Sequence, residues 1–289
     1  MPNAPLLNLY VPYQKRQNLA AAQGIFGRIA TAVQSAGWRI VLRNEYAPVE
    51  GEGYHLVHNR AVTVPHTLCL RRSYIDPFYS IEDSNDRWNW DVATKPFTPT
   101  DGAEWFLKHW RDIVFAGHEI REGGYVFMPL QGKLDERRHF QAMSPLDMIA
   151  ATLLAEPARR ILATLHPSEN YTVEDLDALK QFDGRFEVST QPSLDLLAGC
   201  DYVVTQNSSL AFKGFFAKKP AVLFAQIDFH HIAGSVPKVG INGAFAQLSV
   251  PPTFASYLHW FLRVQAISAW SDDAPARILQ RMRDHGWPI

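Results

Sequence analysis

The chain has 289 residues, which is enough for one large domain or two of ordinary size. Hydrophobic residues make up 47% and charged residues 20%, with a formal net charge of -1. This balance allows a sizeable core and argues against a nucleic-acid binder, which usually presents a strongly basic face. Cys69 and Cys200 both stand in apolar runs, so we expect buried free thiols rather than a disulfide framework.

The chain shows no sign of secretion or membrane insertion. Its N-terminus lacks the basic-then-apolar pattern of a signal peptide, and no apolar run reaches the roughly 20 residues that span a bilayer. We expect a cytoplasmic protein, with peripheral attachment at the inner membrane left open.

The first part of the chain indicates one βαβ unit followed by a less regular segment. A strand over residues 5–11, a helix within 16–36 and a strand over 38–42 follow each other with short joints, and such units build parallel sheets. Residues 44–100 are rich in aromatics, proline and aspartate and show little periodicity. A helix is predicted over 101–116.

After Gly123-Gly124 the alternation of strands and helices becomes regular. Strands are expected over 125–130, 160–165, 186–188, 201–205 and 220–224. The helices between them are expected over 145–155, 172–181, 193–198 and 207–217, and two more, over 252–269 and 273–285, close the chain. The pattern predicts an α/β chain with an N-terminal lobe (1–120), a Rossmann-like lobe (121–250) and C-terminal helices (251–289).

Two polar motifs follow predicted strands, where a parallel sheet binds its ligands. His166-Pro167 comes directly after the strand 160–165, and the imidazole there suits a phosphate oxygen, although it could equally be a turn histidine. Asn207-Ser208-Ser209 opens a helix after the strand 201–205. Helix N-termini favour anions, while simple helix capping by serine or asparagine is the competing interpretation.

A third motif follows the strand 125–130. Gln131 stands directly after it, and Asp135 lies four residues further on in a charged loop. The carboxylate of Asp135 has the chemistry of a nucleophile or base, although a lone aspartate in such a loop is more often solvated surface. Because all three motifs follow strands of one predicted sheet, they point to one crevice.

The order Pro-Leu-Gln…Asp, His-Pro, strand-Asn-Ser-Ser-helix and Lys-Pro-Ala-Val-Leu-Phe, over about residues 125–232, resembles the capsular polysaccharide biosynthesis family. That family includes the bacterial β-Kdo transferases, and the His-Pro and serine-pair motifs also resemble bacterial sialyltransferases. The resemblance implies a GT-B fold, meaning two Rossmann-like lobes with parallel sheets and C-terminal helices. It further implies a metal-independent glycosyltransferase that needs no cofactor.

The resemblance also implies the partners and the roles of residues. The partners would be a CMP-activated donor of Kdo or a related acidic sugar and a glycan or glycolipid acceptor. Gln131, His166, Pro167, Asn207, Ser208 and Ser209 would surround the donor phosphate, and Asp135 stands where the family's catalytic aspartate falls. Lys218-Lys219-Pro220 and Phe229-His230 depart from the family pattern, which leaves the donor's identity open.

A second carboxylate is expected from the N-terminal lobe to activate the acceptor. The aromatic stretch Tyr74–Trp90 contains Glu82, our first choice, and Asp76, its rival. The stretch would either stack on sugars or form the core of that lobe. Neither His230-His231 nor His55-x-x-His58 is accompanied by a carboxylate at ligand spacing, so no metal site is expected.

Two other functions compete with sugar transfer. One is a sugar-nucleotide epimerase of the UDP-N-acetylglucosamine 2-epimerase type on the same fold. The other is a catalytically silent nucleotide- or carbohydrate-binding subunit of a polysaccharide assembly complex. Nucleotide release from a CMP-sugar would separate transfer from both.

Overall fold

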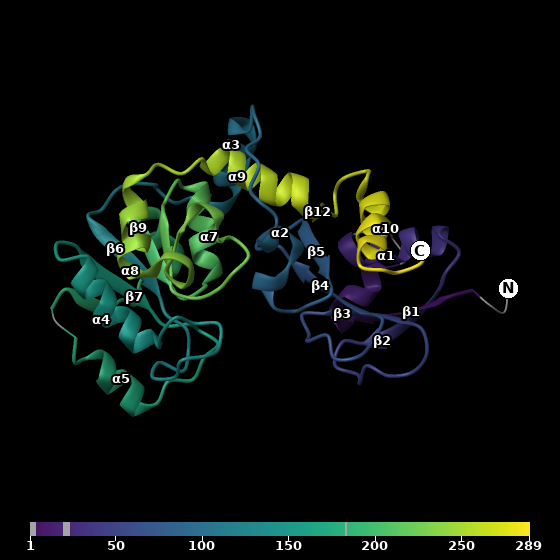
Figure 1. The fold of residues 1–289 in the computed structure, drawn as a ribbon, viewed down its shortest axis with the longest axis horizontal. Coiled ribbons are helices and arrows are strands. Elements are labelled where there is room, and N and C mark those ends of the chain that lie inside the picture. The colour runs from purple at the N-terminus through teal and green to yellow at the C-terminus, as the bar shows by residue number, and fades with distance from the viewer. Residues whose placement is uncertain (1–3, 20–23, 183) are drawn as a thin grey trace. The chain divides into compact units, whose positions relative to one another are not determined.

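The computed structural model describes residues 4–19, 24–182 and 184–289. The chain forms two compact units (Figure 1). Unit 1 comprises Met1–Lys95 and Phe261–Ile289, and unit 2 comprises Pro96–Trp260. The N-terminal and C-terminal segments of the chain therefore share one unit, and the middle of the chain forms the other.

Unit 1 is built on a six-stranded sheet. Its strands are β1 (Leu6–Val11), β2 (Arg39–Asn44), β3 (Tyr54–His58), β4 (Thr67–Arg72), β5 (Phe78–Glu82) and β12 (Ile267–Ser268). They lie in the order β12-β5-β4-β3-β1-β2. The pairs from β4 to β2 are parallel, whereas β5 runs antiparallel to both β4 and β12. The carboxyl end of β5 therefore points away from the edge at which β1 to β4 end.

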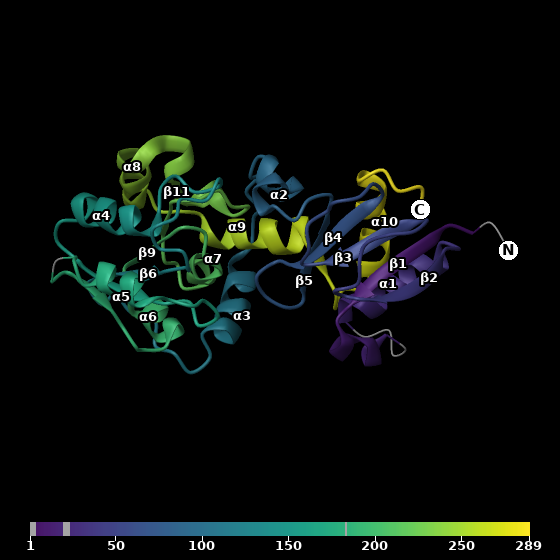
Figure 2. The same cartoon turned by 90° about the horizontal axis from the view of Figure 1, so that it is seen from below.

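Helices cover the unit 1 sheet and supply its main core. They are η1 (Tyr13–Asn18), α1 (Gly24–Ser35), η2 (Arg87–Asn89), α2 (Asp91–Thr94) and α10 (Ala274–Asp284). Helix α10 packs beside α1 (Figures 1 and 2), and Trp287 stacks on Trp38 with ring centroids 6.0 Å apart. The last residues of the chain are thus bound to unit 1 by burial of apolar surface.

Unit 2 contains a second six-stranded sheet, and all its pairs are parallel. Its strands are β6 (Tyr125–Pro129), β7 (Arg160–Thr164), β8 (Phe186–Val188), β9 (Tyr202–Thr205), β10 (Ala221–Leu223) and β11 (Gly234–Ser235). The order is β11-β10-β9-β6-β7-β8. The chain winds outward from β6 to β8, returns to the other side of β6, and winds outward again to β11. This is the doubly wound order of dinucleotide-binding domains.

The helices of unit 2 are α3 (Glu104–Val114), α4 (Pro145–Ala155), α5 (Val173–Leu179), α6 (Ser193–Gly199), α7 (Ser209–Phe216), α8 (Val236–Ala246) and α9 (Phe254–Leu258), with η3 (His230–Ile232) and η4 (Gln247–Ser249). Three of them, α4, α5 and α7, begin at a side-chain cap. Ser144 caps α4, and Thr172 forms a capping box with Asp175 at α5. The π-helix η5 (His259–Gln265) follows α9 and carries the chain from unit 2 into unit 1.

The predicted fold class is confirmed, because both units are α/β layers on mainly parallel sheets. The units divide the chain elsewhere than at 120 and 251. Helix α3 belongs to unit 2 because it packs on α7 and α9, and residues 261–289 belong to unit 1 because α10 packs on α1. Within the described ranges, no helix is both long and apolar enough to cross a bilayer.

Candidate functional site

The strands of unit 2 end in one row. Thr164 of β7 pairs with Pro129 of β6, and Leu223 of β10 pairs with both Thr205 of β9 and Ser235 of β11. The Thr205 hydroxyl donates a hydrogen bond to the Pro129 carbonyl at 2.9 Å, which joins the two halves of the row. The loops that follow these strands therefore emerge side by side at one edge of the sheet.

The polar motifs singled out in the sequence occupy this edge. The strand order reverses between β6 and β9, and such a switch point is where open α/β sheets bind ligands. Gln131, His166 and Asn207 each stand two residues beyond a member of the row. Since neighbouring strands are about 4.8 Å apart, the loops of His166 and Asn207, which follow β7 and β9, emerge roughly 10 Å apart.

The His166 side chain is exposed, and its local contacts determine which nitrogen can act as a donor. The Ser168 N–H donates to His166 Nδ1 at 3.2 Å, so in the neutral ring the proton lies on Nε2. The His166 N–H in turn donates to the Tyr171 hydroxyl at 2.9 Å, which supports the turn begun by Pro167. The imidazole thus presents an N–H donor.

The segment Asn207-Ser208-Ser209 forms the start of α7. Ser208 is its N-cap, and the Ser208 hydroxyl accepts the Leu210 N–H at 3.3 Å. Capping therefore accounts for the Ser208 side chain. Ser209 is exposed and Asn207 half-buried, and neither side chain has a hydrogen-bond partner among the described residues. The Leu210 and Ala211 N–H groups are engaged by Ser208, so the Ser209 N–H and these two polar side chains remain available to an anion.

The loop after β6 presents Asp135 to solvent. Asp135 is exposed, and no hydrogen bond or ion pair engages it among residues 4–19, 24–182 and 184–289. Its neighbour Glu136 is bound to Lys133, with Nζ and Oε2 2.8 Å apart. A carboxylate that is accessible and unpaired can react, whereas Glu136 is already neutralised.

The same loop is fixed in place although it carries exposed charges. Leu134 is completely buried, and the Gln131 side chain accepts a hydrogen bond from Arg138 Nη2 at 3.3 Å. A Cβ added at Gly132 would come 2.3 Å from Glu169 Oε2, so this loop lies directly against the loop that carries His166. The structure thus brings the Gln131 and His166 loops together.

Two buried glutamines that sequence reasoning missed also support this edge. Gln206 Nε2 donates to the Met143 carbonyl at 3.1 Å, and Gln141 bridges to Ala225 after β10. Each side chain is at most 2% exposed. Glutamine is usually a surface residue, so the sequence does not predict that these two glutamines are buried.

The two carboxylates expected from unit 1 differ in accessibility. Asp76 lies in the turn between β4 and β5 and is exposed, with Arg72 Nη1 at 2.9 Å and the Tyr79 hydroxyl at 2.6 Å. Burial acts to raise the pKa of Asp76, but the hydrogen bonds from Tyr79 and Arg72 outweigh it and hold the pKa below its ordinary value. Glu82, our first choice, lies at the carboxyl end of β5 and is 1% exposed.

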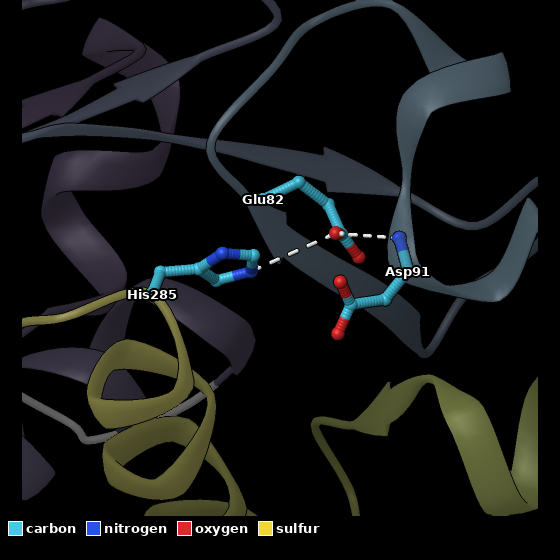
Figure 3. A group of neighbouring side chains, drawn as sticks. All are labelled: Glu82, Asp91 and His285. Atoms are coloured by element: carbon cyan, nitrogen blue, oxygen red, sulfur yellow. Dashed lines mark hydrogen bonds and ion pairs between the residues drawn. The ribbon is translucent and has the colours of Figure 1, made fainter. Parts of the chain in front are cut away.

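Buried Glu82 forms a cluster with half-buried Asp91 and His285 (Figure 3). Glu82 Oε2 accepts the Asp91 N–H at 3.2 Å and lies 3.7 Å from His285 Nε2. Arg281 Nη1 is 2.6 Å from Asp91 Oδ2 and 3.9 Å from Glu82 Oε1. The three side chains have the composition of a metal site, yet a guanidinium already supplies positive charge to both carboxylates. Burial, opposed by Arg281, raises the pKa of Glu82 to about 7.

Among known proteins, only solved structures are similar to this chain. No protein-family model and no curated protein matches the sequence. A beta Kdo 2,7 transferase, KpsC of Thermosulfurimonas dismutans, is 10% identical over 97% of this chain and 99% of its own, with a TM-score of 0.49. The beta Kdo 2,4 transferase of the same organism is 14% identical over 89% and 98%, with a TM-score of 0.46.

A more distant likeness is to the UDP-GlcNAc 2-epimerase of Methanocaldococcus jannaschii. It is 12% identical over 64% of this chain and 50% of its own, with a TM-score of 0.29. The first two are beta Kdo transferases, the class of enzyme that the sequence motifs resemble, whereas the epimerase is of the type named as a competing function. Likenesses this remote assign no activity, so the function has to be inferred from the residues of the site.

Proposed function

We propose that the protein is a glycosyltransferase that moves a sugar from a CMP-activated donor, Kdo or a related acidic sugar, to a glycan or glycolipid acceptor. The observation that carries the proposal is the row of strand ends in unit 2. It gathers His166, the start of α7 and the Asp135 loop at a topological switch point, where such sheets bind nucleotides.

The donor phosphate is bound between the two motifs. The Ser209 N–H at the start of α7, together with the side chains of Asn207 and Ser209, supplies neutral donors on one side. His166 Nε2–H supplies a donor on the other side, and in its protonated form it adds a charge-assisted hydrogen bond. This arrangement needs no metal to bind a single phosphate.

The transfer breaks the bond between the anomeric carbon and the phosphate oxygen, and CMP leaves with that electron pair. His166 stabilises the charge that develops on the departing phosphate. The Asp135 carboxylate acts as the nucleophile, forming a glycosyl ester that the acceptor oxygen later displaces, or as the base for the acceptor. In either case a new bond joins the anomeric carbon to the acceptor oxygen, and the acceptor proton passes to a carboxylate.

The acceptor side is assigned to unit 1. Asp76 is the more accessible of its two candidate carboxylates, because it is exposed. The hydrogen bonds from Tyr79 and Arg72 hold its pKa below the ordinary value, so it is ionised at neutral pH but is a weak base while these bonds are formed. Glu82 is buried against Arg281 and His285, so in the proposal it takes no part in transfer.

The direct test measures nucleotide binding and release. We expect CMP to raise the melting temperature more than UDP or GDP, and CMP to be released from CMP-Kdo only when an acceptor is present. Conversion of UDP-N-acetylglucosamine to its 2-epimer without nucleotide release would favour the epimerase instead. Binding of CMP with no turnover on any acceptor would favour a silent binding subunit.

The role of Asp135 is tested with a matched pair of substitutions. Asp135→Asn preserves shape and removes the charge, so turnover should fall by roughly 1000-fold or more, as for other catalytic groups. CMP affinity and melting temperature should hardly change, because Asp135 is exposed and unpaired. Glu136→Gln is the control, since it alters the next carboxylate in the same loop. Full activity of Asp135→Asn would remove this residue from the mechanism.

A further inference from the structure

The loop that carries Asp135 also places an arginine at the ligand edge of unit 2. Arg138 Nη2 donates to Gln131 Oε1 at 3.3 Å, and Gln131 follows β6, which lies between β7 and β9 in the sheet. The loops of His166 and Asn207 follow those two strands, each of which is about 4.8 Å from β6. The Arg138 side chain is therefore beside the place assigned to the donor phosphate.

Gln131 and the start of α7 lie on the same face of the sheet. Side chains alternate between the two faces along a strand, and Val126, Met128 and Leu130 of the β6 segment belong to a core that also contains residues of α4 and α8. Alternation places Gln131 on the opposite face. Helix α7 packs there with α3, α6 and α9, so the Gln131–Arg138 pair and the start of α7 border the same space.

The charge of Arg138 is not neutralised within the part of the chain that the structure describes. No carboxylate there forms an ion pair with its half-buried guanidinium, and its Nε is buried without a hydrogen-bond partner. Arg138 Cζ lies 5.0 Å from the centroid of the Phe140 ring, which carries no compensating charge. A half-buried cation without an anionic partner costs free energy, and a bound anion would offset that cost.

A buried glutamine fixes the position of Arg138. The Arg138 N–H donates to Gln141 Oε1 at 2.7 Å, and the Gln141 N–H donates to the Arg138 carbonyl at 2.9 Å. Gln141 is 2% exposed and pairs with Ala225 after β10. The arginine thus stands on a turn that is tied to the sheet, so less conformational freedom is lost when a ligand binds to it.

We propose that Arg138 binds the carboxylate of the transferred sugar, beside the donor phosphate. The inference rests on the proposed function and assigns the residue that selects an acidic sugar. In an α-keto acid sugar such as Kdo, the anomeric carbon carries both the carboxylate and the phosphate oxygen, so the two anions are only a few ångström apart. The donors at the start of α7 are neutral, whereas a guanidinium adds a charge and can bind both carboxylate oxygens at once.

Calorimetric titration of the wild type, Arg138→Gln and Arg160→Gln with CMP and with CMP-Kdo tests this. Arg138→Gln should lower the CMP-Kdo affinity about tenfold or more, as expected for the loss of a charged hydrogen bond. The CMP affinity should change much less, because CMP lacks the sugar carboxylate. Arg160→Gln is the matched control, since it removes the same charge at the opposite edge of the sheet, where Arg160 begins β7 and pairs with Glu187.

Arg138→Lys provides a second variant, because it keeps the charge and gives up the two-bond geometry. Its CMP-Kdo affinity should lie between those of the wild type and Arg138→Gln, and melting temperatures near that of the wild type verify that both variants fold. If Arg138→Gln weakens CMP as much as CMP-Kdo, or leaves the CMP-Kdo affinity unchanged, the inference fails while the proposed function stands. If the wild type binds neither ligand, both fail.

Discussion

Replacement of Glu82 by glutamine should change how the stability of unit 1 depends on pH. Burial raises the pKa of Glu82 from 4.5 to about 7 in the folded protein. Between these values the folded state holds a proton that the unfolded state has released, so stability falls as pH rises through this window and levels off above it. Below about 4.5 both states are protonated, and the effect vanishes.

The size of the effect follows from the same shift. A rise from 4.5 to about 7, at about 1.4 kcal/mol per unit, amounts to about 3 kcal/mol. Glu82→Gln resembles the protonated form and can still accept the Asp91 N–H. The variant should therefore match the wild type near pH 4 and exceed it by up to about 3 kcal/mol at pH 8, provided that the environment made by Arg281, Asp91 and His285 stays the same.

Hydrogen exchange followed by mass spectrometry measures this locally, in peptides from β5 and α10 at pH values across the window. The readout is the difference between variant and wild type, which removes the intrinsic pH dependence of exchange. Asp83→Asn is the control, because Asp83 is the neighbouring exposed carboxylate. A difference between Glu82→Gln and wild type that stays constant from pH 5 to pH 8 would refute the reasoning.

Two further predictions concern packing in the described chain. Gly234→Ala should lower the stability of unit 2 by about 1–3 kcal/mol, because a Cβ there would lie 2.1 Å from the Ala244 carbonyl oxygen. Thermal unfolding measures the loss of stability. The control Gly184→Ala, whose added Cβ meets nothing within 4 Å, should be nearly neutral. Cys200 is fully buried, and burial raises the pKa of its thiol to about 12. A thiol reagent at pH 8 should therefore leave Cys200 unmodified until denaturant is added. Rapid labelling of Cys200 in the native protein would contradict this.

Most of unit 2 was predictable because its signals are local. Five of its strands are apolar runs separated by short helices with recognisable caps, such as Ser144 and Thr172. In a parallel sheet every strand end lies at one edge, so the positions of His166, Asn207 and Asp135 followed from strand boundaries alone. The sequence does not predict β11, because a strand of two residues is too short to show a periodic pattern.

Unit 1 was less predictable because its geometry depends on long-range pairing. Strand β3 was not predicted, because its sequence shows little alternation of polar and apolar residues. Strand β5 was not predicted either, because it lies in the aromatic stretch 74–90, which shows little periodicity. The direction of β5 decided the position of Glu82, since β5 runs antiparallel to β4 and its carboxyl end lies at the edge opposite to the one at which β1 to β4 end. Its closest charged partners, Arg281 and His285, lie about 200 residues away in sequence.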